Sequence, residues 1–177
     1  MIKIIFEAHG TTFDNENHKA SGLNDVNLSS LGKKQASNLG KRYKYKKLDA
    51  VFCSKLRRSF LTAKIAFSKR KIRVIRDERL NEIDYGRYNG YPDHKIKKLK
   101  IKYIAKSFPG GQSYTRTTSR VKSFLKDLRK NYSGKTVIII GHRATQYALE
   151  FLINKKPLNK VISADWHWQS GWKYILK

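Results

Sequence analysis

Two histidines, His9 and His142, each stand just beyond a short apolar run that is typical of a buried strand. The run before His9 is Ile2–Phe6, and the run before His142 is the wholly β-branched segment Thr136–Ile140. A neutral imidazole can attack phosphorus and form a covalent intermediate, which divides one difficult step into two easier ones. The two corners therefore make His9 a candidate nucleophile and His142 a candidate partner. The alternative is that both are hydrogen-bonded structural histidines.

The order of apolar runs and amphipathic stretches predicts how these corners come together. Strands are expected at Ile2–Phe6, 49–53, 72–75, 136–140, 161–163 and 172–175, and helices at about 30–43, 56–67, 95–106, 113–132 and 144–153, with loops at 11–27 and 79–92. This alternation predicts a three-layer α/β/α sandwich with a mostly parallel central sheet. Sites in such sheets form at the carboxyl ends of the strands, so His9, Ser54 and His142 are expected on one rim.

Several polar motifs occur between and beside the two histidine corners. They are Phe6-Glu7-Ala8-His9-Gly10-Thr11-Thr12 with Asn15, Ser54-Lys55-Leu56-Arg57-Arg58 ending in Thr62-Ala63, Leu80-Asn81-Glu82 with Gly86 and Gly90, and Gly110-Gly111-Gln112-Ser113. Taken together and in this order, they resemble the motifs of the histidine phosphatase superfamily, the phosphoglycerate-mutase-like family. The resemblance extends from Ile2 to about Ile153. It implies the phosphoglycerate-mutase-like form of the α/β sandwich.

The resemblance also implies roles for individual residues. His9 would be the nucleophile that becomes a phosphohistidine, and His142 would contact the transferring phosphoryl group. Arg58 and Asn15 would bind phosphate oxygens, as suits a guanidinium fork. Glu82 would protonate the leaving oxygen and then activate water. Asp84 is the alternative to Glu82 for that role.

One position departs from the family in a way that bears on activity. Ala8 stands where the family has an arginine before its nucleophilic histidine, and Thr11 replaces the usual Glu or Gln. Losing one preorganised donor to developing charge costs about 10²–10³ in rate. Arg143, which directly follows His142, or Arg87 is a candidate to supply a guanidinium from another direction.

Charge and composition constrain the setting of the protein. The 177 residues suit one domain over 1–177, and 39 Lys and Arg against 13 Asp and Glu give a formal net charge of +26. Such a charge attracts polyanions, including nucleic acid non-specifically, although a merely lysine-rich surface is the simpler explanation. The single cysteine, Cys53, excludes a disulfide framework, and there is no signal-peptide or membrane-span pattern, so a cytoplasmic location is expected.

The remaining signals concern ligands. The five histidines show no metal-ligand spacing and no nucleotide-binding glycine loop is present, so no metal and no cofactor are expected. Three tryptophans in the tail, Trp166, Trp168 and Trp172, either line a pocket or pack the closing strands. The sequence indicates no oligomeric state.

The sequence thus predicts a cofactor-independent phosphomonoesterase that hydrolyses small phosphorylated metabolites through a phosphohistidine, with activity reduced by Ala8. The alternative is an impaired family member that binds phosphorylated ligands or nucleic acid. A third reading is that the alanine at position 8 was engineered.

Overall fold

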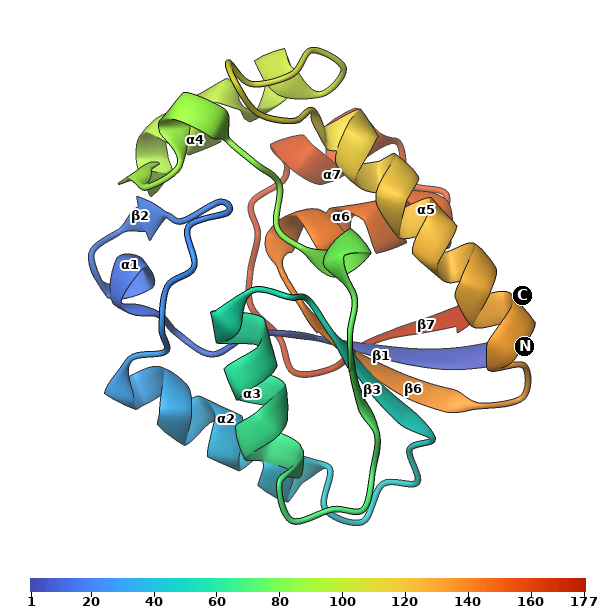
Figure 1. Cartoon of the computed structure of the whole chain (residues 1–177). Helices are drawn as coiled ribbons and strands as arrows, with labels where there is room; N and C mark the ends of the chain where they lie inside the picture. The colour runs from blue at the N-terminus through green and yellow to red at the C-terminus, as the bar shows by residue number, and fades with distance from the viewer.

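A five-stranded sheet forms the centre of the molecule, in the order β4-β3-β6-β1-β7 (Figure 1). Its strands are β1 (Ile2–Ala8), β3 (Ala50–Cys53), β4 (Val74–Arg76), β6 (Thr136–Gly141) and β7 (Trp172–Leu176). Neighbours among the first four pair in parallel, and β7 pairs antiparallel with β1 at one edge. The computed structural model describes all 177 residues. The mostly parallel sheet predicted from the sequence is confirmed.

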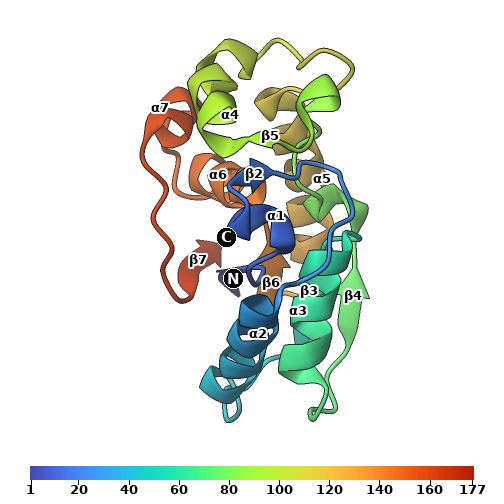
Figure 2. The same ribbon diagram turned by 90° about the vertical axis from the view of Figure 1, so that its left-hand side faces the viewer.

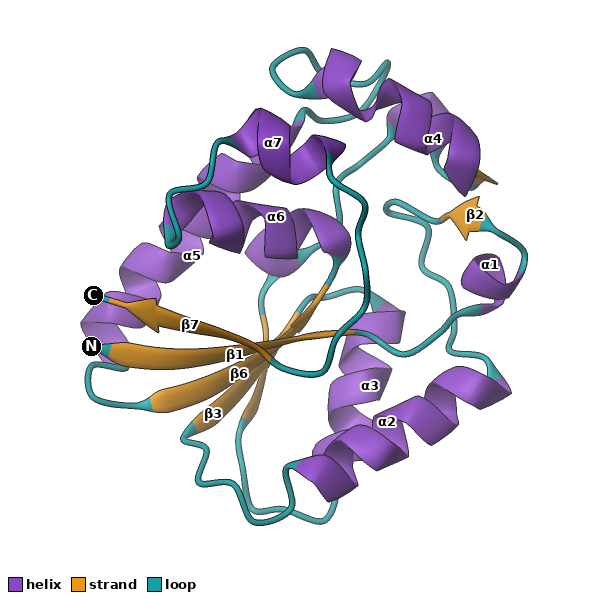
Figure 3. Ribbon diagram, turned by 180° about the vertical axis from the view of Figure 1, so that it is seen from behind, coloured by secondary structure: helices purple, strands orange, loops and turns teal.

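Helices cover both faces of the sheet, as the sandwich requires (Figure 3). The helices α2 (Ser30–Arg42) and α3 (Arg57–Phe67) lie on one face, while α5 (Tyr114–Asn131), α6 (Arg143–Leu152) and α7 (Leu158–Ser163) lie on the other. Ile5 and Ile138 pack with the first group, and Phe6 and Ile139 with the second. Successive residues of each strand therefore face opposite layers, which explains why the central strands are mostly apolar.

A smaller layer stands above the carboxyl ends of the strands. It consists of α1 (Phe13–Glu16), β2 (Lys19–Ala20), η2 (Gly86–Tyr88), β5 (Tyr91–Pro92), α4 (Asp93–Leu99) and η3 (Lys100–Tyr103), and is reached from the sheet through η1 (Glu78–Leu80). The short strands β2 and β5 pair antiparallel, so the two segments predicted as loops, 11–27 and 79–92, meet here (Figure 2). Both segments thereby form a wall over the rim of the sheet.

Two predicted elements differ from the structure. The expected strand at 161–163 is the end of α7, which begins after Pro157 and turns Ile162 inward, so only β7 closes the sheet. A three-residue apolar run is too short to distinguish a strand from a helical turn. The expected helix at 95–106 is α4 followed by the tighter turn η3, where Lys100 turns inward and donates to the hydroxyl of Tyr147 at 3.1 Å.

The starts of α2 and α5 agree with the sequence-based expectation, and the single cysteine is buried. Ser29 accepts from the amide of Gly32 at the start of α2, and Ser113 does the same for Arg116 at the start of α5. Burial raises the pKa of Cys53 to about 12, so this thiol is unreactive at neutral pH. None of the helices combines the length and apolar composition that crossing a bilayer requires.

We expect the sheet interior to dominate stability. Ile138 is fully buried on the central strand β6, whereas Ile175 on the edge strand β7 is 47% exposed. Ile138→Ala should lower the free energy of unfolding by about 2–5 kcal/mol because it leaves a cavity, and Ile175→Ala should cost about 1 kcal/mol or less. Urea unfolding followed by circular dichroism measures both. Equal losses of unfolding free energy in the two variants would contradict the expectation that the sheet interior dominates stability.

Candidate active site

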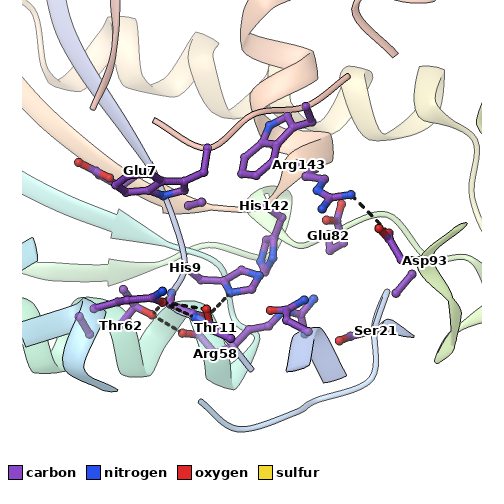
Figure 4. A pocket seen from close by; sticks show the side chains of 18 of the residues that line it. Glu7, His9, Thr11, Ser21, Arg58, Thr62, Glu82, Asp93, His142 and Arg143 are labelled. Atoms are coloured by element: carbon purple, nitrogen blue, oxygen red, sulfur yellow. Dashed lines mark hydrogen bonds and ion pairs between the residues drawn. The ribbon is translucent and has the colours of Figure 1, made fainter. Parts of the chain in front are cut away.

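A cavity of about 590 Å³ opens at the carboxyl ends of β1, β3 and β6 (Figure 4). All six site residues expected from the sequence line it: His9, Asn15, Arg58, Glu82, His142 and Arg143. They come from β1, β6, the helices that follow β3 and β6, and the layer above the rim. The volume suits a small-molecule ligand. The structure thus brings the six residues together at one rim of the sheet.

His9 is fixed by its own loop. Its Nδ1 lies 2.7 Å from the carbonyl oxygen of Gly10, so Nδ1 carries the proton and Nε2 keeps its lone pair. The loop itself passes close to α2, where a Cβ on Gly10 would lie 2.5 Å from the carbonyl oxygen of Gly32. Burial, together with the charge of Arg58, lowers the pKa of His9 to about 3. His9 is therefore a neutral imidazole with a free nitrogen at physiological pH.

His142 lies beside it, with the two imidazole centroids 5.0 Å apart. Its Nε2 lies 2.8 Å from Oγ of Ser54, and that oxygen already accepts from the amide of Leu56. Nε2 is the one acceptor within reach of the Ser54 hydroxyl proton, so the hydroxyl donates to Nε2 and the proton of His142 lies on Nδ1. That nitrogen has no hydrogen-bond partner. Burial, followed by the charge of Arg58, lowers the pKa of His142 well below its usual value, so it is a neutral donor.

Arg58 is 2% exposed, and it contacts no carboxylate. Its two terminal nitrogens donate to the backbone carbonyls of Asn24 and Gly22, at 2.9 and 2.7 Å. Those bonds orient the guanidinium without neutralising it. Burial lowers the pKa of Arg58, and the charges of Glu82 and Asp25 oppose that shift only in part. A buried cation of this kind creates a strong local preference for an anion.

Glu82 lies across the cavity from Arg58 and is 9% exposed. Its Oε1 accepts from the amides of Ile83 and Ala144, at 2.9 and 3.2 Å, and the second amide belongs to the first turn of α6. Arg120 also donates to the carbonyl of Glu82, at 2.9 Å. The alternative residue, Asp84, is instead bound to the amide of Gly86 and to Asn89 and does not line the cavity.

The surroundings of Ala8 decide between the two candidate arginines. Arg143 begins α6, lines the cavity and lies close enough for its charge to contribute to the lowered pKa of His9. Arg87 is exposed in η2 and lies outside the cavity lining, so the expectation for Arg87 is wrong. Asn15 accepts from the amide of Thr12 through Oδ1, which leaves its NH₂ group free toward the cavity.

The three tail tryptophans divide between the two expected roles. Trp172 is buried on β7 and packs against Phe6, while Trp166 and Trp168 line the cavity. The ring of Trp166 also stacks on Trp172, with centroids 5.6 Å apart. The tail therefore packs the closing strand and contributes to the site at once.

Other residues of the site carried little or no signal in the sequence. Thr62 accepts from the amide of Gly10 at 3.0 Å and so links the His9 loop to α3; its position four residues after Arg58 was the available clue. Asp93, which pairs with Arg143 at 3.3 Å, gave none.

Glu7 is also part of the lining, although its charge is engaged. Its Oε1 accepts from Tyr43 at 2.6 Å and from Arg42 at 2.9 Å. Burial raises the pKa of Glu7, and these two bonds oppose that shift. Arg42 thus offsets a carboxylate that would otherwise repel an anionic ligand. No group of three or more His, Cys, Asp or Glu side chains is arranged to hold a metal ion.

Comparison with known proteins identifies the family. The family model described as the histidine phosphatase superfamily (branch 1) matches residues 4–168. The chain belongs to the histidine phosphatase superfamily. Phosphoserine phosphatase 1 of Hydrogenobacter thermophilus is 31% identical to this histidine phosphatase over 158 residues, which cover 84% of this chain and 74% of that protein. The uncharacterized phosphatase PhoE of Bacillus subtilis is 28% identical over 149 residues, covering 84% and 76%.

Solved structures confirm the fold of this histidine phosphatase. Bacillus stearothermophilus YhfR superposes with a TM-score of 0.84 at 24% identity, over 95% of this chain and 87% of that one. The mycobacterial glucosyl-3-phosphoglycerate phosphatase Rv2419c in complex with VO3 gives 0.82 at 23% identity, over 92% and 87%. The family and its relatives identify the protein as a phosphatase.

The neutral histidines predict how the stability of this phosphatase depends on pH. An unfolded histidine gains its proton near pH 6.5, while folded His9 stays neutral down to about pH 3 and His142 stays neutral well below its usual value. In that window the unfolded chain binds more protons, so the free energy of unfolding falls as the pH falls. Between pH 7 and pH 4.5, the free energy of unfolding should fall by about 1 kcal/mol or more less in His142→Gln than in the unaltered protein.

Urea unfolding at the two pH values tests this expectation. His94→Gln is the matched control, because His94 is exposed on α4 and away from the cavity, and its loss should equal that of the unaltered protein. An unchanged loss in His142→Gln would show that His142 is protonated as readily in the folded protein as in the unfolded chain.

Proposed function

We propose that this histidine phosphatase hydrolyses small phosphorylated metabolites through a phosphohistidine formed at Nε2 of His9. The observation that carries the proposal is the pairing of a neutral His9, whose Nε2 is free, with a buried guanidinium that lacks a carboxylate. A dianionic phosphoryl group would supply the missing charge beside Arg58 and present phosphorus to His9. Two of the proteins compared above have names that give small phosphorylated molecules, phosphoserine and glucosyl-3-phosphoglycerate, which is consistent with such a substrate.

In the first step, Nε2 of His9 attacks phosphorus while the bond from phosphorus to the leaving oxygen breaks. Glu82 in its acid form gives its proton to that oxygen, and the alcohol departs. In the second step, the Glu82 carboxylate takes a proton from water as the water attacks phosphorus, and the bond from nitrogen to phosphorus breaks. The products are orthophosphate, neutral His9 and protonated Glu82, which restores the starting state.

The phosphoryl oxygens need donors throughout both steps. We expect Arg58 and the NH₂ group of Asn15 to donate from the α3 and α1 side, and the unpartnered Nδ1–H of His142 to donate from the end of β6. Arg143 takes the place of the arginine that is absent at Ala8, because it carries a guanidinium from the start of α6 into the same cavity. The neutral state of His142 suits a donor that must not repel these cations.

A second candidate function is binding of phosphorylated ligands or nucleic acid without turnover. Ala8 and the net charge of +26 favour it. RNA affinity measured between 50 and 200 mM salt separates specific recognition from counterion release. Over this range purely electrostatic binding falls by about 10³–10⁵ for 6–10 phosphate contacts. Specific binding without hydrolysis of any phosphomonoester would favour this candidate.

The nucleophile is tested by His9→Ala in para-nitrophenyl phosphate hydrolysis at pH 5.5 and pH 7. We expect the unaltered protein to turn over and His9→Ala to fall to the uncatalysed background, because the substitution removes the nitrogen proposed to attack phosphorus. His94→Ala should hydrolyse the ester like the unaltered protein. Turnover that survives in a folded His9→Ala protein would exclude the phosphohistidine route.

The substitute arginine is tested by a double-mutant cycle with position 8. Arg143→Ala should lower kcat/KM by about 10²–10³, since one donor to the developing charge is lost. Ala8→Arg restores the family arginine, so adding it to Arg143→Ala should recover most of that loss. Arg87→Ala, an exposed arginine outside the cavity, is the control and should change kcat/KM little. If Arg143→Ala keeps full activity, Arg143 is not the substitute.

A further inference from the structure

We propose that Trp166 is a positioning residue that holds the guanidinium of Arg143 in the cavity, which rests on the role proposed above for Arg143. The guanidinium carbon of Arg143 lies 5.0 Å from the ring centroid of Trp166. A guanidinium against an indole face is attracted by the π system, and Trp is the strongest aromatic partner for it. The segment between α7 and β7 therefore contacts Arg143 directly through Trp166.

The other contact of Arg143 is much less restrictive. Its Nη1 lies 3.3 Å from Oδ1 of Asp93, and both side chains are about 40% exposed, at 40% and 42%. Exposed ion pairs of this kind contribute little and exchange readily with other anions. An incoming phosphoryl group can therefore replace Asp93 as the acceptor. The face of the guanidinium stays on Trp166 during that exchange, because stacking leaves the N–H edge free.

Trp166 is itself held by the sheet that carries His9. Its ring stacks on Trp172 at 5.6 Å with an interplanar angle of 28°. Trp172 in turn packs edge-on against Phe6, at 5.6 Å and 65°, and is paired with it across β7 and β1. Phe6 lies two residues before Ala8. A continuous aromatic column thus connects the strand that lacks its arginine to the arginine that replaces it.

The choice of Trp rather than Phe at position 166 supports this role. The indole Nε1 is buried and has no hydrogen-bond partner, which is unfavourable and which phenylalanine would avoid. The larger π face of Trp is the property that offsets this cost. An arginine that begins a helix has many rotamers, so a fixed platform reduces the entropy lost when the anion binds.

The test is the affinity for inorganic phosphate, measured by isothermal titration calorimetry, which does not depend on turnover. Trp166→Leu removes the π face and should weaken phosphate binding about fivefold to tenfold. Trp166→Phe keeps an aromatic platform, so its loss of binding free energy should be at most about half that of Trp166→Leu. Arg143→Ala combined with Trp166→Leu should bind phosphate no more weakly than Arg143→Ala alone.

Tyr132→Leu is the matched control, because Tyr132 is another partly buried aromatic at the edge of the same core and lies away from the cavity. It should bind phosphate like the unaltered protein, and the melting temperature of each variant shows whether it is folded. The proposal is overturned if the losses of phosphate-binding free energy from Trp166→Leu and Arg143→Ala add. It is also overturned if folded Trp166→Leu binds phosphate as tightly as Tyr132→Leu. If Trp166→Leu does not fold, Trp166→Phe takes its place in both comparisons.

Hydrolysis distinguishes this proposal from the proposed function. A protein that binds phosphate in an Arg143- and Trp166-dependent manner but releases no para-nitrophenol would refute the hydrolytic function and leave the positioning role standing. A protein that hydrolyses the ester with equal efficiency in Trp166→Leu would refute the positioning role alone.

Discussion

The site depends on the buried positive charge of Arg58, which no carboxylate contacts directly and which the nearby acids Glu82 and Asp25 offset only in part. Arg58 is held by two backbone carbonyls, which fix its direction without neutralising it. The resulting field acts with burial to keep His9 and His142 neutral. The same charge that attracts an anion therefore also keeps the attacking nitrogen unprotonated, so recognition and nucleophilicity have one physical origin. Two of the three acids in the lining are paired with other arginines, Glu7 with Arg42 and Asp93 with Arg143, and the third, Glu82, is held by backbone amides.

The loss of an arginine from β1 moves one part of the site to more distant elements. An arginine at position 8 would be oriented by the strand that also carries His9, with no help from elsewhere. Arg143 is oriented instead by a helix start, by Asp93 in the upper layer and by Trp166 in the tail. The proposed substitution thus makes the phosphate site depend on packing at the edge of the sheet, where Trp172 meets Phe6.

Much of this arrangement could be predicted from the sequence, because it is set by local signals. Strand ends at Ala8 and Gly141 place both histidines on one rim, and the Arg58 and Glu82 motifs stand in segments whose order alone indicates the family. The helix starts predicted near residues 30 and 113 are also set locally, since the capping side chains of Ser29 and Ser113 each accept from an amide three residues on.

The parts that were missed are contacts between distant segments. The pairing of β2 with β5, the contact of Asp93 with Arg143 and the stacking of Trp166 join residues that no periodicity connects. Residues 161–163 were assigned to a strand because three apolar residues fit either state, and the preceding Pro157 with the burial of Ile162 decides for a helix only once packing is known.

The antiparallel pairing of β1 with β7 places Ile2 opposite Leu176, so the contact joins segments 174 residues apart in a chain of 177. Such a contact closes a loop nearly as long as the chain and contributes strongly to contact order, which slows folding. During synthesis the strand that leads to His9 is made well before its edge partner β7, so this pairing forms only after the segments between them have been made. Synthesis order alone would therefore keep a partly made chain without its aromatic column, and the phosphate site would be completed among the last events of folding.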